Sequence, residues 1–216
     1  GNRRRQGGGR HRSVMSDEQD QVQERSTPYR GFMRLDVYRL RHHDFNGGWS
    51  IDLSREVLER GNAVAVLPYD PDRDEVVLIE QFRIGAYTAT EASPWQIEIV
   101  AGMIETHQLA EETAHRETQE ETGLALYELE PVHHYLSSPG CTSESIRMYC
   151  GRVDAAGAGG LSGVAHEGEY IRVFTVSSEE AFAMLDAGRI ENGMTIIALQ
   201  WLKLNRERLL ETWLDN

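Results

Sequence analysis

Short runs of alternating apolar and polar residues occupy much of the chain, and this period of two is typical of β-strands. Between residues 32 and 60, Leu35 and Val37 alternate with more polar neighbours, and Asn46-Gly47-Gly48 is typical of a hairpin turn. Further strands are predicted over residues 63–68, 75–82, 95–100, 127–136, 145–153 and 170–176.

Helical segments are predicted in three places. Residues 108–122 predict a helix that ends at Gly123, because glycine is common just after the last turn of a helix. Ser177-Ser178-Glu179-Glu180 begins a short second helix with N-cap chemistry, and residues 194–213 predict a long terminal helix. Strands, then a strand–helix unit, then more strands and terminal helices predict a mixed α/β fold.

Three segments differ in character along the chain. Residues 1–27 are rich in Gly and Arg and then in Asp, Glu and Gln, so we expect a disordered leader there, outside the fold. Residues 28–60 are expected to form an N-terminal β subdomain, and residues 61–216 the main domain. The total of 216 residues suits one globular domain, or one domain plus a small appendage.

Charge and composition narrow the function. The formal charge is −13, although residues 1–14 carry five Arg and no acid, so the rest of the chain is strongly acidic. An acidic body repels nucleic acid, whereas divalent cations can bridge it to a phosphorylated small molecule. No apolar run long enough to span a membrane and no signal peptide is visible, and Cys141 and Cys150 form no disulfide framework or zinc motif. We therefore expect a cytoplasmic protein without a nucleic-acid or membrane partner.

The helix predicted over residues 108–122 carries the strongest chemical signal. Glu117 and Glu121 are four residues apart and share one helix face, with Glu120 at its border. Clustered carboxylates suit hard cations such as Mg²⁺ or Mn²⁺. A solvated acidic face is the alternative, and the spacing alone leaves both open.

The segments that flank this helix extend the pattern. Gly102, Arg116, Glu117, Glu120, Glu121, Gly123 and Leu124 fall in one fixed spacing, after a strand that is expected to end at Val100 and a loop expected to begin at Ala101. The pattern resembles the Nudix box of glycine, glutamate, Arg-Glu and Glu-Glu. This sequence departs from it twice, with Gln108 in place of the first glutamate and Thr118 in place of an aliphatic residue.

The resemblance extends over about residues 29–213 and is most similar to the bacterial ADP-ribose pyrophosphatase branch of the Nudix family. The segments that carry it are Tyr29-Arg30-Gly31-Phe32, Ser54-Arg55-Glu56, Leu78-Ile79-Glu80-Gln81-Phe82-Arg83, Ala101-Gly102-Met103-Ile104-Glu105 and Ser138-Pro139-Gly140. Pro139, about fifteen residues past the box, matches a marker of that branch. The resemblance implies a Nudix fold, which is an α/β/α sandwich around a mixed β-sheet with an N-terminal antiparallel strand subdomain.

The resemblance also implies roles for the residues of the box. The Ala101 carbonyl, Glu117 and Glu121 would hold Mg²⁺ or Mn²⁺, Glu120 would assist, and Arg116 would orient the glutamates. Outside the box, Glu167 on the loop of residues 163–170 is the matching candidate for the catalytic base, with Glu169 as a close second. Two solvated loop acids are the alternative reading of that pair.

Substrate contacts follow from the same resemblance. Phe32 and Arg55 match positions that sandwich adenine, and Arg83 matches a phosphate-side contact. Glu144, just after the Pro139 loop, is a candidate to accept hydrogen bonds from the terminal ribose. A core Phe32, a surface Arg55 and an exposed Glu144 are the alternatives. In this branch the N-terminal strands are exchanged across a homodimer, and we expect residues 28–60 to do the same.

Together these features predict a metal-dependent hydrolase that converts ADP-ribose into AMP and ribose 5-phosphate. Two other functions remain open at this stage. One is hydrolysis of another nucleoside diphosphate sugar, and the other is binding of ADP-ribose by a catalytically impaired Nudix domain.

Overall fold

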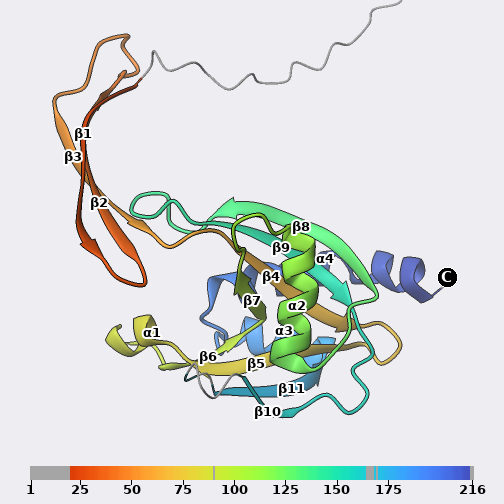
Figure 1. Ribbon diagram of the computed structural model, residues 1–216. Coiled ribbons are helices and arrows are strands. Elements are labelled where there is room, and N and C mark those ends of the chain that lie inside the picture. The colour runs from red at the N-terminus through yellow and green to blue at the C-terminus, as the bar shows by residue number, and fades with distance from the viewer. Residues whose placement is uncertain (1–19, 90, 164–167, 169, 215–216) are drawn as a thin grey trace, which may run out of the picture. The chain divides into compact units, whose positions relative to one another are not determined.

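A computed structural model describes residues 20–89, 91–163, 168 and 170–214 (Figure 1). The described residues divide into two compact units. Unit 1 contains the residues up to Arg60 together with Gly140–Thr142, and unit 2 contains Gly61–Pro139 and the residues from Ser143 onward.

Unit 1 is an antiparallel sheet of three strands in the order β1-β2-β3, with β1 at Asp20–Arg30, β2 at Arg34–His42 and β3 at Leu53–Glu59. Strand β1 overlaps the leader expected over residues 1–27, so residues 20–27 belong to the sheet and correct that boundary. The polar sequence of β1 does not predict a strand. Pairing with β2, which is not visible in local sequence, supplies its backbone hydrogen bonds.

A buried carboxylate holds β1 against β2. Asp36 of β2 is fully covered and accepts hydrogen bonds from Thr27 Oγ1 at 2.6 Å, Arg25 Nη2 at 2.6 Å and Arg34 Nε at 2.9 Å. In the connection from β2 to β3, the Asp44 carboxylate accepts from the backbone of Asn46 and Gly48, which confirms the expected turn.

Unit 2 contains a mixed sheet of eight strands. Its bounds are β4 Ala63–Asp70, β5 Glu75–Phe82, β6 Trp95–Glu98, β7 Val100–Met103, β8 Glu128–Leu136, β9 Ser145–Arg152, β10 Gly160–Ser162 and β11 Ile171–Ser177. The main order is β10-β11-β5-β4-β9-β8, with β6 on β5 and β7 on β4. All eight residues of β4 are buried, as expected for an apolar strand at the centre of a sheet covered on both faces.

The sheet divides between β4 and β5. These two strands pair only at their turn, through Tyr69 with Val76 and Asp70 with Glu75, and then separate. The segment of β6 and β7 fills the gap, because β6 pairs with β5 while β7 pairs with β4. The single strand expected over residues 95–100 is therefore two short strands. Ala101 and Gly102 lie inside β7, which corrects the expectation that a loop begins there.

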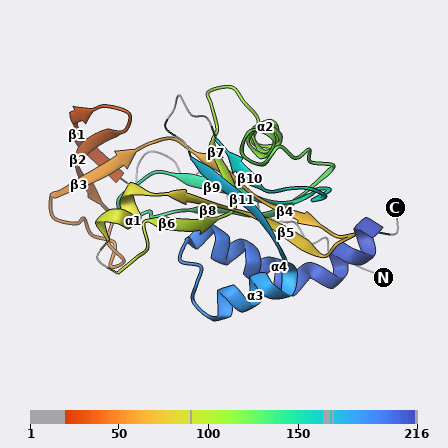
Figure 2. The same ribbon diagram turned by 90° about the horizontal axis from the view of Figure 1, so that it is seen from below.

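Helices cover both faces of this sheet (Figure 2). Helix α2, Ala110–Thr122, lies on one face, and α3, Ser178–Asp186, and α4, Gly193–Leu214, lie on the other. Leu199, Leu202 and Leu209 of α4 are fully buried in one core layer, while Ala110 and Ala114 of α2 belong to the second. The predicted α/β/α sandwich is confirmed.

Two short elements were not expected from the sequence, namely α1, Ile84–Thr88, and β10. Both are too short to show a period of their own. Within the described ranges, no helix is long and apolar enough to cross a membrane.

Candidate active site

Helix α2 begins two residues later than the sequence predicts. Gln108 and Leu109 precede the helix, and the Glu112 carboxylate accepts a hydrogen bond from the Leu109 backbone N–H at 3.2 Å. At the other end, Gly123 adopts φ 74° and its N–H donates to the Gln119 carbonyl at 2.9 Å, as in a glycine C-cap. These two contacts satisfy one backbone group at each end of α2.

Glu121 is the carboxylate that α2 places against β7. It is only 7% exposed, and it accepts a hydrogen bond from the Ala101 N–H at 3.4 Å. The N–H and C=O groups of one strand residue point to the same side. The Ala101 carbonyl is therefore directed to the side of the strand that Glu121 occupies, so two oxygen donors come from different elements to one place.

Glu117 lies one turn earlier and packs directly over Gly102. A Cβ built on Gly102 would overlap Cγ, Cδ and Oε1 of Glu117, so only glycine leaves room for this side chain. The side chain of Glu117 is 14% exposed. Gly102 therefore permits a close approach between β7 and the Glu117 side chain of α2.

Arg116 ties the glutamates of α2 together. Its Nη2 lies 2.8 Å from Glu117 Oε1, and its Nη1 donates to Glu120 Oε2 at 2.7 Å. Partial burial opposes its charge, but the Glu117 and Glu120 carboxylates outweigh that effect and raise the pKa of Arg116. The Glu120 side chain is 49% exposed, whereas Glu117 and Glu121 are largely buried, so the sequence's distinction between Glu120 and the other two carboxylates has a structural basis.

Arg83 directly follows β5 and is held by a buried acid that the sequence did not single out. Glu98 of β6 is 1% exposed, and it accepts from Arg83 Nε at 3.0 and 3.1 Å and from Nη2 at 2.6 Å. Gln81 and Asn192 also donate to Glu98, at 3.3 and 3.1 Å. The only sequence signal for Glu98 is an acid at the end of a predicted strand, and that does not indicate burial.

A profile of the NUDIX domain matches residues 59–210. The chain belongs to the Nudix family. Among relatives, the ADP-ribose pyrophosphatase of Escherichia coli strain K12 is 50% identical over 189 residues, which cover 88% of this chain and 90% of the relative. The ADP-ribose pyrophosphatase of Haemophilus influenzae is 41% identical over 189 residues, with 87% of each chain covered.

More distant matches agree with the same family. The GDP-mannose pyrophosphatase of Enterobacter sp. strain 638 is 33% identical over 152 residues, which cover 70% of this chain and 78% of the relative. The crystal structure of an ADP compounds hydrolase matches with a TM-score of 0.65 at 18% identity, covering 88% of this chain and 97% of that chain. At that identity it supports the Nudix fold alone.

Both departures from the Nudix box have local explanations. The Thr118 side chain is fully buried, and its hydroxyl donates to the Ala114 carbonyl at 2.8 Å, so it packs like the aliphatic residue it replaces. Gln108 donates to Glu105 at 3.4 Å and accepts from the Thr113 hydroxyl at 3.2 Å. In this Nudix chain the amide thus braces the turn before α2.

Glu144 is a second site residue whose burial the sequence did not indicate. It is 8% exposed, which excludes the exposed acid that was the alternative reading. Burial and the nearby Glu144 carboxylate together raise the pKa of Tyr135, on the neighbouring strand β8, to about 12. Glu144 therefore lies in a partly enclosed polar setting in the Nudix unit.

Phe32 and Arg55 belong to unit 1 and do not form a stacked pair there. Phe32 lies in the turn between β1 and β2 and is 92% exposed, whereas Arg55 pairs with Tyr38 in the middle of β3. Tyr38 is four residues from Arg34 at the turn, or about 13 Å along a strand. The exposed ring also excludes the alternative that Phe32 is a core residue.

The two candidate bases, Glu167 and Glu169, lie outside the described residues. Within the described part of the chain, no group of three or more His, Cys, Asp or Glu side chains is arranged to hold a metal ion. The carboxylates of Glu117 and Glu121 and the Ala101 carbonyl are oxygen donors, and oxygen donors suit the divalent metals that Nudix hydrolases generally use.

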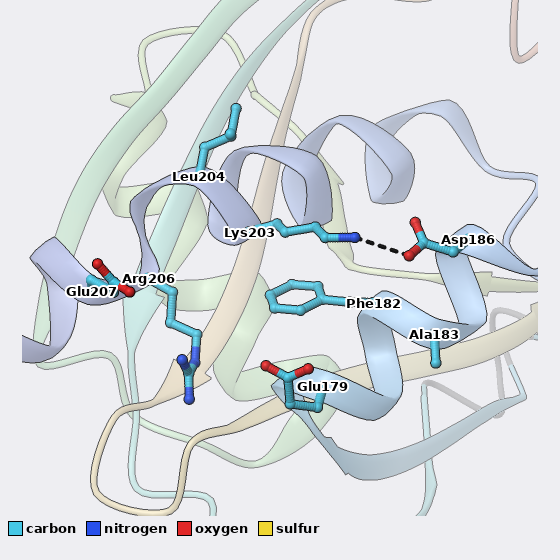
Figure 3. A pocket seen from close by; sticks show the side chains of 8 residues that line it. All are labelled: Glu179, Phe182, Ala183, Asp186, Lys203, Leu204, Arg206 and Glu207. Atoms are coloured by element: carbon cyan, nitrogen blue, oxygen red, sulfur yellow. Dashed lines mark hydrogen bonds and ion pairs between the residues drawn. The ribbon is translucent and has the colours of Figure 1, made fainter.

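A separate hollow of about 530 Å³ lies between α3 and α4 (Figure 3). Lys203 donates to Asp186 at 2.9 Å there, and its ammonium lies 5.7 Å from the centroid of the Phe182 ring. This hollow is on the face of the sheet opposite α2 and contains none of the predicted site residues. The chemistry of the Nudix box is therefore not located there.

Proposed function

We propose that this Nudix protein hydrolyses ADP-ribose to AMP and ribose 5-phosphate in a reaction that needs a divalent metal. The observation that carries the proposal is the 50% identity with the Escherichia coli ADP-ribose pyrophosphatase over about nine tenths of both chains. The GDP-mannose pyrophosphatase match is weaker in both identity and coverage, so it supports that substrate less.

Mg²⁺ or Mn²⁺ is the proposed metal, held by the carboxylates of Glu117 and Glu121 and by the Ala101 carbonyl. The donation from the Ala101 N–H to Glu121 and the fit of Glu117 over Gly102 support this set, because both contacts fix oxygen donors before any ligand binds. When bound, such an ion neutralises a diphosphate and lowers the pKa of a water molecule.

The protein's own groups supply the rest of the proposed mechanism. Arg116 orients Glu117 and Glu120 through its two ion pairs, and Glu120 assists from the exposed side. Glu167 is the proposed general base, with Glu169 as the second candidate. A carboxylate in that role takes a proton from the attacking water, and in-line displacement at one phosphorus releases AMP and ribose 5-phosphate.

Four residues supply the proposed substrate contacts. Arg83 contacts the diphosphate, and Glu144 accepts hydrogen bonds from the terminal ribose. Phe32 and Arg55 would hold adenine, since an aromatic ring and a guanidinium both stack on a purine. Because the two are separated within one copy of unit 1, a sandwich requires side chains from two copies, which supports the proposed homodimer.

The exposed surface of unit 1 also supports a homodimer. Its described apolar side chains with the greatest exposure are Val22, Tyr29, Phe32, Phe45 and Ile51, all at least 59% exposed. A three-stranded sheet with so little covered apolar surface is marginal alone and gains stability from a partner.

A product assay tests the proposal directly. The protein is incubated with ADP-ribose, GDP-mannose, other nucleotide sugars and dinucleotides, with and without Mg²⁺, and products are separated by chromatography. We expect AMP from ADP-ribose only with metal. Preferred turnover of another sugar nucleotide would refute the substrate, and tight ADP-ribose binding without products would indicate an impaired Nudix domain.

Two variants separate the proposed metal site from the proposed base. Glu121→Gln should lose metal-dependent turnover and metal binding together. Glu167→Gln should lower turnover but keep metal binding, measured by titration with Mn²⁺ followed by electron paramagnetic resonance. Normal turnover in Glu167→Gln would show that the base lies elsewhere.

A further inference from the structure

Glu98 is the most completely buried acid of unit 2 that contacts a predicted substrate residue. Its carboxylate receives three hydrogen bonds from Arg83 and one each from Gln81 and Asn192, so both oxygens are occupied by donors. These contacts join three segments, namely the end of β5, the end of β6 and the residues that enter α4.

Stability alone gives little reason for such a group. Burying two charges has a desolvation cost that their attraction recovers only in part, and well-packed apolar residues often serve as well. A buried ion pair is better explained where it fixes the orientation of a side chain that contacts a ligand. Here the Arg83 side chain is 43% exposed while the Glu98 side chain is buried. The buried carboxylate therefore anchors a guanidinium that reaches the surface.

The pair lies beside the proposed metal site. Glu98 precedes Ala101 by three residues, which span at most about 10 Å of extended chain. Ile99 between them donates its N–H to the Thr195 hydroxyl at 3.1 Å, so this short segment is anchored. The bonds to Glu98 use Nε and Nη2 of Arg83, so the carboxylate holds one edge of the guanidinium.

We propose that Glu98 is a positioning residue, which sets the guanidinium of Arg83 for contact with the substrate diphosphate. The proposal rests on the function proposed above. A bidentate carboxylate restricts the rotation of the guanidinium plane, so less conformational entropy is lost when the substrate binds. Glu98 itself does not touch the substrate.

Asn192 supports the same arrangement from α4. Its amide nitrogen donates to Glu98, while its carbonyl oxygen accepts from the Thr195 N–H at 3.1 Å, in the position of an N-cap. One side chain thus links the carboxylate to the start of a 22-residue helix. The orientation of Arg83 depends through these contacts on two strands and one helix.

Steady-state kinetics of two Glu98 variants test the proposal, because charge and position predict opposite results. Glu98→Gln removes a negative charge near an anionic substrate, so a purely electrostatic role predicts a lower KM. Loss of positioning predicts a KM for ADP-ribose that rises roughly tenfold, with kcat changed less than about threefold. Glu98→Asp keeps the charge but shortens the side chain, and positioning again predicts a raised KM.

A double-variant cycle assigns the effect to Arg83. If Glu98 acts through Arg83, Glu98→Gln should add almost nothing to the KM of an Arg83→Ala protein. Asp74→Asn is the matched control. Asp74 forms a comparable carboxylate pair with Arg206 elsewhere in unit 2, so this variant reports the structural cost of losing such a pair and should leave KM unchanged.

The outcomes separate the two proposals. Wild-type protein without ADP-ribose turnover overturns the function, whatever the variants do. With an active wild type, the positioning role is overturned by an unchanged or lowered KM in Glu98→Gln, or by effects of Glu98→Gln and Arg83→Ala that add. If Glu98→Gln fails to fold, Asn192→Ser takes its place in the test. This variant keeps an N-cap oxygen but loses the Glu98 contact, so it should raise KM by a smaller factor, and an unchanged KM would overturn the positioning role.

Discussion

The contact between Gly102 and Glu117 makes a sharp prediction for Gly102→Ala. No unusual backbone angle is involved, since φ of Gly102 lies outside the left-handed region, and the added methyl group alone is the perturbation. That methyl would overlap three successive atoms of Glu117, so rotation of the carboxylate tip cannot relieve the clash. The side chain must change rotamer, and it then loses its 2.8 Å contact with Arg116.

The expected loss of activity is larger than the expected loss of stability. Displacing a reacting or ligating group by about 1 Å costs on the order of 100-fold in rate. Overpacking usually costs about 1–3 kcal/mol in the free energy of unfolding. We therefore expect kcat/KM for ADP-ribose to fall about 100-fold with a raised metal requirement, while the protein remains folded.

Metal titrations of kcat/KM and thermal unfolding measure the two effects separately. Gly193→Ala is the control, because nothing lies within 4 Å of a Cβ at Gly193 in the first turn of α4. It should retain wild-type activity. A Gly102→Ala protein with kcat/KM and metal dependence within about threefold of wild type would refute the reasoning, because Glu117 would then not need its present position.

Two further predictions follow from other contacts. Gln108→Glu should leave kcat/KM unchanged or raise it. It should lower the melting temperature measured without metal, because a carboxylate would face Glu105 where the Gln108 amide now donates. A large fall in kcat/KM would show that the amide is required. The pKa of Asp36 is lowered from 3.8 to about 2. The hydrogen bond from the Thr27 hydroxyl is the largest cause, and the Arg25 and Arg34 guanidinium groups add to it, while burial acts in the opposite direction. Because the folded pKa is the lower one, this stabilisation is present above pH 3.8 and is lost as the pH falls through about 2. Asp36→Asn should flatten the acid limb of unfolding curves recorded by circular dichroism, and an unaltered limb would exclude the linkage.

The local pattern of apolar and polar residues was sufficient to predict those helices and strands that show a regular hydrophobic period. The strand predicted over residues 75–82 coincides with β5, and the helix predicted over residues 108–122 differs from α2 only at its first two residues. Those two residues serve the cap, which sequence spacing does not distinguish from the first turn. The placement of Glu117 and Glu121 on one face of α2 was predictable because their spacing is fixed by one helix.

Features that depend on distant partners could not be predicted in this way. Strand β1 has no apolar period and is held by β2 and by the bonds to Asp36. The division of residues 95–103 into β6 and β7 depends on β4 and β5 moving apart, which no local window contains. The burial of Glu98 follows from the same division, so its role was hidden from the sequence.

The β6–β7 segment, which fills the gap between β4 and β5, restricts where insertions and deletions can occur in this chain. Glu98 on β6 and Gly102 on β7 are separated by a fixed number of residues, and alternate residues of a strand face opposite sides. One inserted or deleted residue between them would turn one of the two side-chain rows to the wrong face. The length of the segment of residues 98–102 therefore sets the spacing between Arg83 and α2. Insertions and deletions among related chains should be absent from this segment.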